Sequence, residues 1–553
     1  MADKKIESPV SAHIDHLRNH GEENNAVWDS VIEEAQAANI NEHNMTVRQA
    51  LRSYPWAVVW SLTISMSIIM EGYDTNLIGS FYGYPAFQKQ FGVEHGDGYQ
   101  VPQAWQSALG AGGTAGCILG AFLDGYLVKH FGFKKVFTGA MFVMCAFIFV
   151  SFFGHTLGLH VAGQVLCGIP WGIFATIGPA YSSELLPMAL RSYLTAYTNM
   201  CFAIGQFISA GVLQSLISRD DQWSYRIPYA VQWIWPVPLL FIGVLMPESP
   251  WWQVRHGRYD EALATVQRLT AGEEKTKARQ TVAMMIHTNE IEQEIEAGSS
   301  YWDCFRGNNL RRTEISCMSF TGQVLAGSQF AYTGTYFFEQ AGMSPTDAYK
   351  LGLGGTAVAF VGTILSWFLM KNFGRRSMYL SGMGLMSSYL LIIGFLTLKS
   401  NNSVVWAQSA LCIVWLFTFS LTVGPMGWSI APEVSSTRLR SKTICLARNA
   451  YYLAITVANV IEPYMMNPAA WNWRGRTGFF WFVFAFLTFA WGYFRLPETK
   501  GRTFEELDIM FAAGVPTRKF RKYHVDPYAE SVAIKDRARE SPLEKSTDMM
   551  SPC

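Results

Sequence analysis

The sequence predicts an all-α membrane protein whose twelve transmembrane helices form two pseudo-symmetric six-helix bundles. Half of its 553 residues are apolar and only 15% are charged, whereas soluble proteins carry about 25% charged residues. The apolar residues gather into stretches of about 20, the length that crosses a bilayer as a helix. Short motifs recur in the two halves of the chain, which predicts the paired bundles.

Twelve stretches are long and apolar enough to be membrane helices. They cover residues 55–80, 103–125, 134–154, 160–182, 194–217, 228–246, 313–338, 348–370, 378–398, 403–427, 441–465 and 477–496. No cleavable signal peptide is expected before them, because the first 52 residues are polar and charged. The predicted units are a tail (1–54), a first bundle (55–250), a helical linker (251–312), a second bundle (313–500) and a second tail (501–553).

Basic residues in the short loops predict the orientation. Loops near residues 129–135, 371–376 and 438–442 carry most of the Lys and Arg, and such loops face the cytosol. Both tails and the linker are therefore expected in the cytosol of a multi-pass protein, most simply of the plasma membrane.

Several function classes are disfavoured. A net charge of +1 gives no attraction to nucleic acid. None of the nine cysteines shows CxxC spacing, so neither a metal site nor a redox pair is suggested. No GxxxxGK[ST] phosphate loop occurs, which argues against ATP-driven transport, and nothing indicates an enzyme.

Three motifs recur in the same order. "SSELLPMALRS" and "APEVSSTRLRS" place Glu184 and Glu433, and likewise Arg191 and Arg440, 249 positions apart. "PESPWW" pairs with "PETKGR", and "KHFGFKK" with "KNFGRRS". Each motif falls at a predicted cytosolic helix end, so the ionic groups could form gates that separate when the bundles rock, or a purely structural salt-bridge network. The candidate gate residues are Glu184, Arg191, Glu433, Arg440, Lys129, Lys371, Arg375 and Arg376.

Charged residues inside membrane helices are costly and suggest function. Glu71 and Asp74 stand three apart, on one face of the first helix. Burial and mutual repulsion favour the protonated form of at least one of them, which suits a proton carrier; the alternative is a hydrogen-bonded structural pair. Arg448 could hold an acid ionised. We expect Glu462 to be hydrated near the outer end of its helix, and Asp124 to be a gate or helix-end residue.

The chain resembles the sugar porter family of the major facilitator superfamily over about residues 50–510. "PESPWWQVRHGRYDEA", "PETKGRTFEELD" and "EGYDTNLIGS" are similar to its signatures, and "GYDTNLIGSFYGYPAFQKQFG" and "TYFFEQAG" are most similar to fungal α-glucoside (maltose-type) proton symporters. The resemblance implies proton-coupled uptake of an α-glucoside, with Asp74 as the principal proton carrier and Glu71 its partner. It implies no cofactor besides the proton gradient, and as partners only sugar, proton and lipid bilayer, with no obligate protein partner.

The resemblance also implies sugar ligands. Amides can both donate and accept hydrogen bonds, and aromatic rings stack on sugars. The matching positions are Gln206, Gln323, Gln329 and Trp428, with Asn449 and Tyr451 as further candidates. A single Gln in a membrane helix is often only a link between helices. Ser420 stands where monosaccharide porters often have Glu, which would widen the site.

The loop motif departs from the family pattern. Both copies lack its usual Asp, having Lys129-His130 and Lys371-Asn372 instead, so the usual gate chemistry is not assured. Other functions remain open: a hexose or other oligosaccharide carrier, by uniport or symport, or a non-transporting sugar sensor. Asn401 begins a glycosylation sequon in a predicted outer loop.

Overall fold

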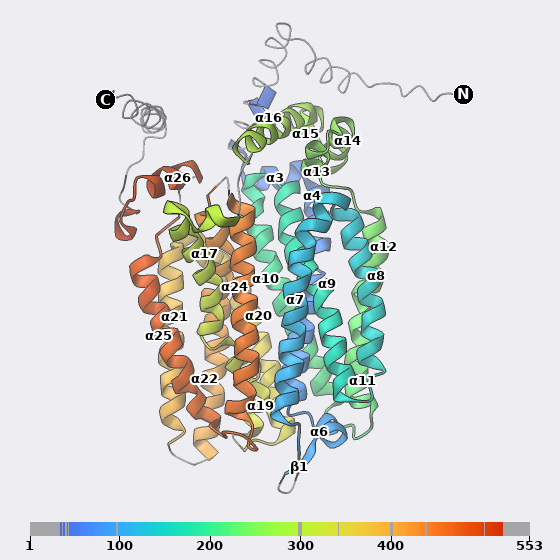
Figure 1. Ribbon diagram of the computed structural model, residues 1–553, viewed down its shortest axis with the longest axis vertical. Helices are drawn as coiled ribbons and strands as arrows, with labels where there is room; N and C mark the ends of the chain where they lie inside the picture. The colour runs from blue at the N-terminus through green and yellow to red at the C-terminus, as the bar shows by residue number, and fades with distance from the viewer. Residues whose placement is uncertain are drawn as a thin grey trace, which may run out of the picture.

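The helices form two sets that stand side by side in the computed structural model, one blue to green and one yellow-green to red (Figure 1). The structure describes residues 34–523, apart from 36, 39–40, 42–43, 96–97, 297–300, 341, 399–401, 437–438, 501, 503 and 522. The helices that link the sets lie at one end, here called the linker end. The opposite end, called the hairpin end, holds the only described strands, β1 (Val93–His95) and β2 (Gly98–Gln100), which pair antiparallel.

The first set contains six spans, the first and last of them broken. They are α4 (Pro55–Ser65) with α5 (Ile68–Phe81), α7 (Gln103–Phe131), α8 (Phe133–Phe152), α9 (Leu157–Leu185), α10 (Met188–Leu216), and α11 (Trp223–Val231) with η1 (Gln232–Ile234) and α12 (Pro236–Leu245). Two short helices flank the first span, α3 (Val47–Ser53) and α6 (Pro85–Phe91).

The second set repeats this order. Its spans are α17 (Gly307–Leu325) with α18 (Ser328–Tyr332) and α19 (Gly334–Gln340), α20 (Pro345–Asn372), α21 (Arg375–Leu396), α22 (Asn402–Leu421) with α23 (Val423–Val434), α24 (Arg440–Met466), and η4 (Arg474–Arg476) with α25 (Thr477–Arg495). Its spans are interrupted at Gly327, whose φ of 88° suits glycine, at Thr333 and at Thr422. Irregular backbone at membrane depth is tolerated where it is buried in protein or lines a cavity.

The linker end carries smaller helices. They are α13 (Pro250–Arg255), α14 (Tyr259–Leu269), α15 (Glu273–Thr276), α16 (Ala278–Glu296), η2 (Tyr301–Phe305), α26 (Phe504–Ala512) and η5 (Thr517–Lys519). The apolar faces of α13, α14 and α16 bury Val254, Val266 and Val282 in a small core of their own. On the other side, Arg312 of α17 lies 2.5 Å from Asp508 of α26. This ion pair ties the first helix of the second set to α26, which follows its last span.

Nine described helices are each apolar and long enough to cross a membrane, and α3 with α4–α5 forms a tenth candidate bent by 91°. The spans outside this set are α10 and α17–α19, because α17 carries Arg311, Arg312 and Glu314 and α10 carries polar residues such as Gln206. Both are nevertheless full helical elements at the predicted positions.

One expectation needs correction. The predicted helix 103–125 continues to Phe131, so Asp124 lies within α7, 7% exposed, rather than at a helix end. The small hairpin β1–β2 is an addition to the predicted all-α class and leaves that class intact. The sequon residue Asn401 lies outside the described residues.

Glycines let neighbouring helices of the first set approach closely. A Cβ on Gly116 would lie 2.3 Å from the Val165 carbonyl oxygen of α9, and one on Gly168 would lie 2.3 Å from the Gly113 carbonyl oxygen of α7. A Cβ on Gly72 of α5 would likewise lie 2.1 Å from the Phe202 carbonyl oxygen of α10. In a bilayer there is little hydrophobic driving force between helices. Small residues at the interface instead let the helices approach closely and gain van der Waals contacts.

Candidate substrate cavity

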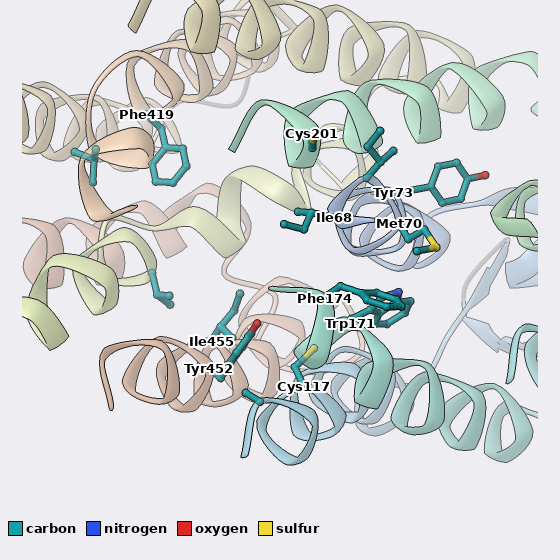
Figure 2. Packing of buried hydrophobic residues seen from close by; sticks show 14 of the residues in the cluster. Ile68, Met70, Tyr73, Cys117, Trp171, Phe174, Cys201, Phe419, Tyr452 and Ile455 are labelled. Atoms are coloured by element: carbon teal, nitrogen blue, oxygen red, sulfur yellow. The ribbon is translucent and has the colours of Figure 1, made fainter. Parts of the chain in front are cut away.

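A cavity lies between the two sets of helices, enclosed by α5, α7 and α9 on one side and α18 and α24 on the other. It contains about 840 Å³ of space between atoms, including its opening. Its polar lining consists of Glu71, Asp74, Gln164, Gln329, Asn459 and Glu462, among aromatic residues that include Tyr82, Trp171, Tyr332, Tyr451 and Tyr452. Figure 2 shows Tyr452 and Ile455 of α24 facing Cys117 of α7 at this boundary.

Asp74 is held by two amides. Its Oδ1 accepts hydrogen bonds from Gln232 Nε2 at 2.7 Å and from Gln164 Nε2 at 3.3 Å, and the residue is 3% exposed. No described cation lies within ion-pair distance of it. A buried carboxylate without a nearby cation is costly. Asp74 is therefore the first candidate in the cavity for a group that takes up a proton.

Glu71 has a different environment. It lines the cavity one turn from Asp74, and the charge of Arg448 acts on it without a direct ion pair. Arg448 is 5% exposed and donates to the Tyr452 hydroxyl at 2.8 Å. Its guanidinium carbon lies 4.4 Å from the centre of the Trp428 ring, close enough for a cation–π contact. The predicted pair of acids therefore consists of two groups with unlike partners.

Two of the predicted sugar ligands, Gln329 and Tyr451, line the cavity. The buried Gln206 lies beside the cavity residue Tyr332, and its Nε2 has no described hydrogen-bond partner. Gln323 instead donates to the carbonyl oxygen of Gly424 at 2.7 Å, next to the break between α22 and α23.

The remaining candidates, Trp428, Asn449 and Ser420, do not line the cavity. Trp428 packs on Arg448 as described above, and Asn449 donates to Cys445 Sγ at 3.5 Å while its Oδ1 has no described partner. Ser420 is buried, 8% exposed, and is also absent from the cavity lining.

The sequence analysis did not single out Gln164 and Asn459 of the cavity lining, nor Gln232, which binds Asp74 from outside the lining. Gln164 and Gln232 are far from Asp74 in the sequence and carried no motif. Asn459 and Glu462 stand three apart on α24, the same spacing that singled out Glu71 and Asp74. The expectation that Glu462 is hydrated is wrong: it is 2% exposed and accepts a hydrogen bond from Trp481 Nε1 at 2.7 Å.

Hydrogen bonds close the cavity toward the hairpin end. The Tyr349 hydroxyl of α20 donates to the Ser80 carbonyl oxygen of α5. Between α24 and α7, Asn459 Nδ2 donates to the Gly110 carbonyl oxygen at 3.0 Å, and Thr456 Oγ1 donates to Thr114 Oγ1 at 2.9 Å. The structure therefore has its hairpin end shut.

The repeated motifs form two related ionic sites at the linker end. In the second half, Arg375 Nη2 lies 3.0 Å from Glu433 Oε1, and Thr499 Oγ1 donates to Glu433 Oε2 at 2.5 Å. In the first half, Ser249 donates to Glu184, but the cation is Arg255 of α13, with Nη1 2.9 Å from Glu184 Oε1. The reason is local: "KHFGFKK" has Phe133 where "KNFGRRS" has Arg375.

The second glutamate of each repeat caps a helix. Glu248 Oε1 accepts from the Phe133 N–H at 2.8 Å, and Glu498 Oε1 accepts from the Arg375 N–H at 2.8 Å. Burial raises the pKa of Glu248, although the backbone donors at Ser249, Phe133 and Lys134 oppose that effect.

The other gate candidates are less closely placed. Arg376 Nη2 donates to the Tyr493 carbonyl oxygen at 2.7 Å, Arg191 is half-buried and Lys129 is exposed. The side chains of Lys371 and Arg440 are not among those described. No group of three or more metal-binding side chains occurs in the described part of the chain.

Two helical sets around a central polar cavity, with buried acids and a shut end, define a multi-pass carrier of the alternating-access class. A family model described as "Sugar (and other) transporter" matches residues 60–511. The chain belongs to this family of transporters.

Several similar proteins come from yeast. In Saccharomyces cerevisiae, the maltose permease MAL31 is 38% identical over 514 residues, which cover 91% of this chain and 84% of the permease. The alpha-glucosides permease MPH3 is 36% identical over 523 residues, which cover 92% of this chain and 86% of the relative.

Solved structures confirm the predicted fold. The partially occluded inward-open xylose transporter XylE from E. coli superposes with a TM-score of 0.66 at 20% identity, covering 81% of this chain and all of that one. The proton:xylose symporter XylE bound to 6-bromo-6-deoxy-D-glucose gives a TM-score of 0.67 at 21% identity, covering 83% and 99%. The twelve-helix arrangement in two six-helix bundles is that of the major facilitator superfamily.

Proposed function

We propose that this protein takes up an α-glucoside such as maltose across the plasma membrane, together with one or more protons. The observation that carries the proposal is the pair of acids in the central cavity, Glu71 and Asp74, of which Asp74 is buried and has no described cation within ion-pair distance. The similarity to maltose and α-glucoside permeases of yeast supports the choice of sugar.

The transport cycle follows from these groups. With the hairpin end open to the outside, Asp74 takes up a proton, and sugar binds among Gln329, Tyr451 and the neighbouring polar groups. The hairpin-end contacts then close, and rocking of residues 55–250 against 313–500 opens the linker end to the cytosol. Loss of the proton there returns Asp74 to its charged form and releases the sugar.

In this proposal the linker end, both tails (1–54 and 501–553) and the linker (251–312) lie in the cytosol. The ionic sites of Glu184 with Arg255 and of Glu433 with Arg375 act as gates there. The transport cycle needs no cofactor in this proposal, since the proton gradient supplies the driving force.

The test is sugar-induced alkalinisation of a weakly buffered suspension of cells that lack other α-glucoside carriers. We expect maltose to raise the external pH as radiolabelled maltose accumulates. A uniporter of hexose or oligosaccharide would accumulate nothing against a gradient and leave the pH unchanged. A sensor would take up no sugar at all.

A further inference from the structure

Glu462 is a buried carboxyl that the proton-coupling scheme does not use. It lines the cavity from α24 and is 2% exposed. Its Oε2 accepts the Trp481 indole N–H, whereas its Oε1 has no hydrogen-bond partner among the described residues. No described cation lies within ion-pair distance. A buried acceptor left unpaired is costly, which points to a partner that arrives with the substrate.

The cavity is elongated, and Glu462 stands at the opposite end from Glu71. On α24 the lining runs from Tyr451 to Pro463, which is about 18 Å at 1.5 Å per residue. On the facing side it runs from Glu71 to Tyr82, or roughly 16 Å. The residues that line the cavity therefore extend along the helices for more than the length of one pyranose ring.

The chemistry around Glu462 suits sugar hydroxyls. A carboxylate accepts hydrogen bonds on both oxygens, so it can bind adjacent hydroxyls of one ring. Asn459, one turn earlier, uses its Nδ2 on the Gly110 carbonyl oxygen and keeps its Oδ1 as an acceptor. The Tyr82 hydroxyl donates to the Gln106 carbonyl oxygen at 2.9 Å and can also accept. Donors on this wall are already engaged, whereas acceptors remain, which matches a ligand rich in O–H groups.

We propose that Glu462 and Asn459 form a distal subsite that binds the second glucosyl ring of a disaccharide, while the first ring lies near Glu71, Gln329 and Tyr451. This inference rests on the proposed function and adds a residue that selects disaccharides over single sugars.

The test compares Glu462→Gln with Trp481→Phe, which removes the indole donor together with part of the buried ring. Three quantities are measured: the KM for maltose uptake, the inhibition constant of the single-ring analogue methyl α-glucoside, and the proton-to-maltose ratio. For Glu462→Gln we expect the KM for maltose to rise about tenfold, as for the weakening of a hydrogen bond to a substrate hydroxyl. The inhibition constant and the proton ratio should stay within about twofold, and Trp481→Phe should keep the low KM.

Other outcomes overturn the inference. Equal weakening of maltose and methyl α-glucoside would mean that Glu462 does not distinguish the second ring. The same KM change in Trp481→Phe would make the acid a structural acceptor only, and a fall in the proton ratio would make it a proton site. An unchanged KM removes the subsite while leaving the proposed function intact, whereas a wild-type protein that transports no α-glucoside removes both.

Discussion

Asp74 and Glu71 are neighbours on one helix, yet they are equipped for different tasks. Asp74 is bound by two neutral amides, which can hold either of its protonation states. Glu71 lies near the charge of Arg448, whereas Asp74 has no described cation within ion-pair distance. We therefore assign proton exchange to Asp74 and charge balance to the Glu71–Arg448 pair.

Replacing Asp74 by Asn tests this assignment. The amide keeps the shape of the side chain but can neither gain nor lose a proton, so we expect accumulation against a gradient to be abolished while maltose exchange persists. Accumulation ratios and counterflow of radiolabelled maltose measure the two activities. Asp124→Asn is the matched control, since Asp124 is also buried but absent from the cavity lining. Unchanged accumulation in Asp74→Asn would refute the role.

Arg448 is predicted not to tolerate Lys. The planar guanidinium is stacked among Trp428, Tyr451 and Tyr452, with its carbon 4.4 to 5.2 Å from the three ring centres, and an ammonium cannot reproduce that stacking together with the bond to Tyr452. We expect Arg448→Lys to lower the maximal uptake rate by about tenfold, equivalent to roughly 1.4 kcal/mol. Initial rates, normalised to the protein in the plasma membrane, measure this. Full activity in the Lys variant would show that charge alone suffices.

At this scale the sequence revealed the charged residues better than their partners. Glu71, Asp74 and Arg448 stand out because charge is rare in apolar helices. Gln232 could not be predicted as a partner of Asp74, because 158 positions separate them and only the fold brings them together. Gln323 matched a sugar-binding pattern, but in this conformation its amide satisfies backbone carbonyls at a helix break.

The helices themselves were predictable because apolar stretches of membrane length admit few other structures. Their ends were less so: α7 and α9 continue past the apolar stretch into polar residues, where helical hydrogen bonds still form. The β1–β2 hairpin has only three residues in each strand, too few for an alternating pattern. Close packing through glycine likewise depends on which helices meet.

The contact between α7 and α9 gives a prediction at the scale of elements. In Gly116→Ala the new Cβ would meet the backbone of α9 at 2.3 Å, so the helices must separate, at a cost of about 1–3 kcal/mol. We expect a lower thermal unfolding temperature in detergent and less folded protein. Gly125→Ala on the same helix is the control, because nothing lies within 4 Å of its Cβ position. Equal destabilisation by both changes would contradict the close-packing explanation.

At the scale of the whole molecule, the sequence repeat predicted two related halves, and the linker end shows how far the relation extends. Both halves use a glutamate to cap a helix and a Ser or Thr to bind the gate acid. They differ in the cation, since Phe133 occupies the position of Arg375. Arg255 was not predicted as the substitute, because it lies outside the repeated loop motif, on a linker helix.

This difference predicts that the two gates contribute unequally. Arg375 donates from both Nε and Nη2 to Glu433, and both side chains are less than a quarter exposed. Arg255 makes one contact to Glu184, and its side chain is 42% exposed, where water screens an ion pair. Arg375→Gln should therefore change the maximal uptake rate by about fivefold or more and Arg255→Gln by less than about twofold, because pairs shielded from solvent contribute more than exposed ones.

Uptake at saturating maltose measures both, with Lys129→Gln as a control for loss of charge at the same end. Equal effects of Arg375→Gln and Arg255→Gln would mean that the halves open symmetrically despite their different chemistry, and that the cation's position in the chain does not determine the strength of the gate.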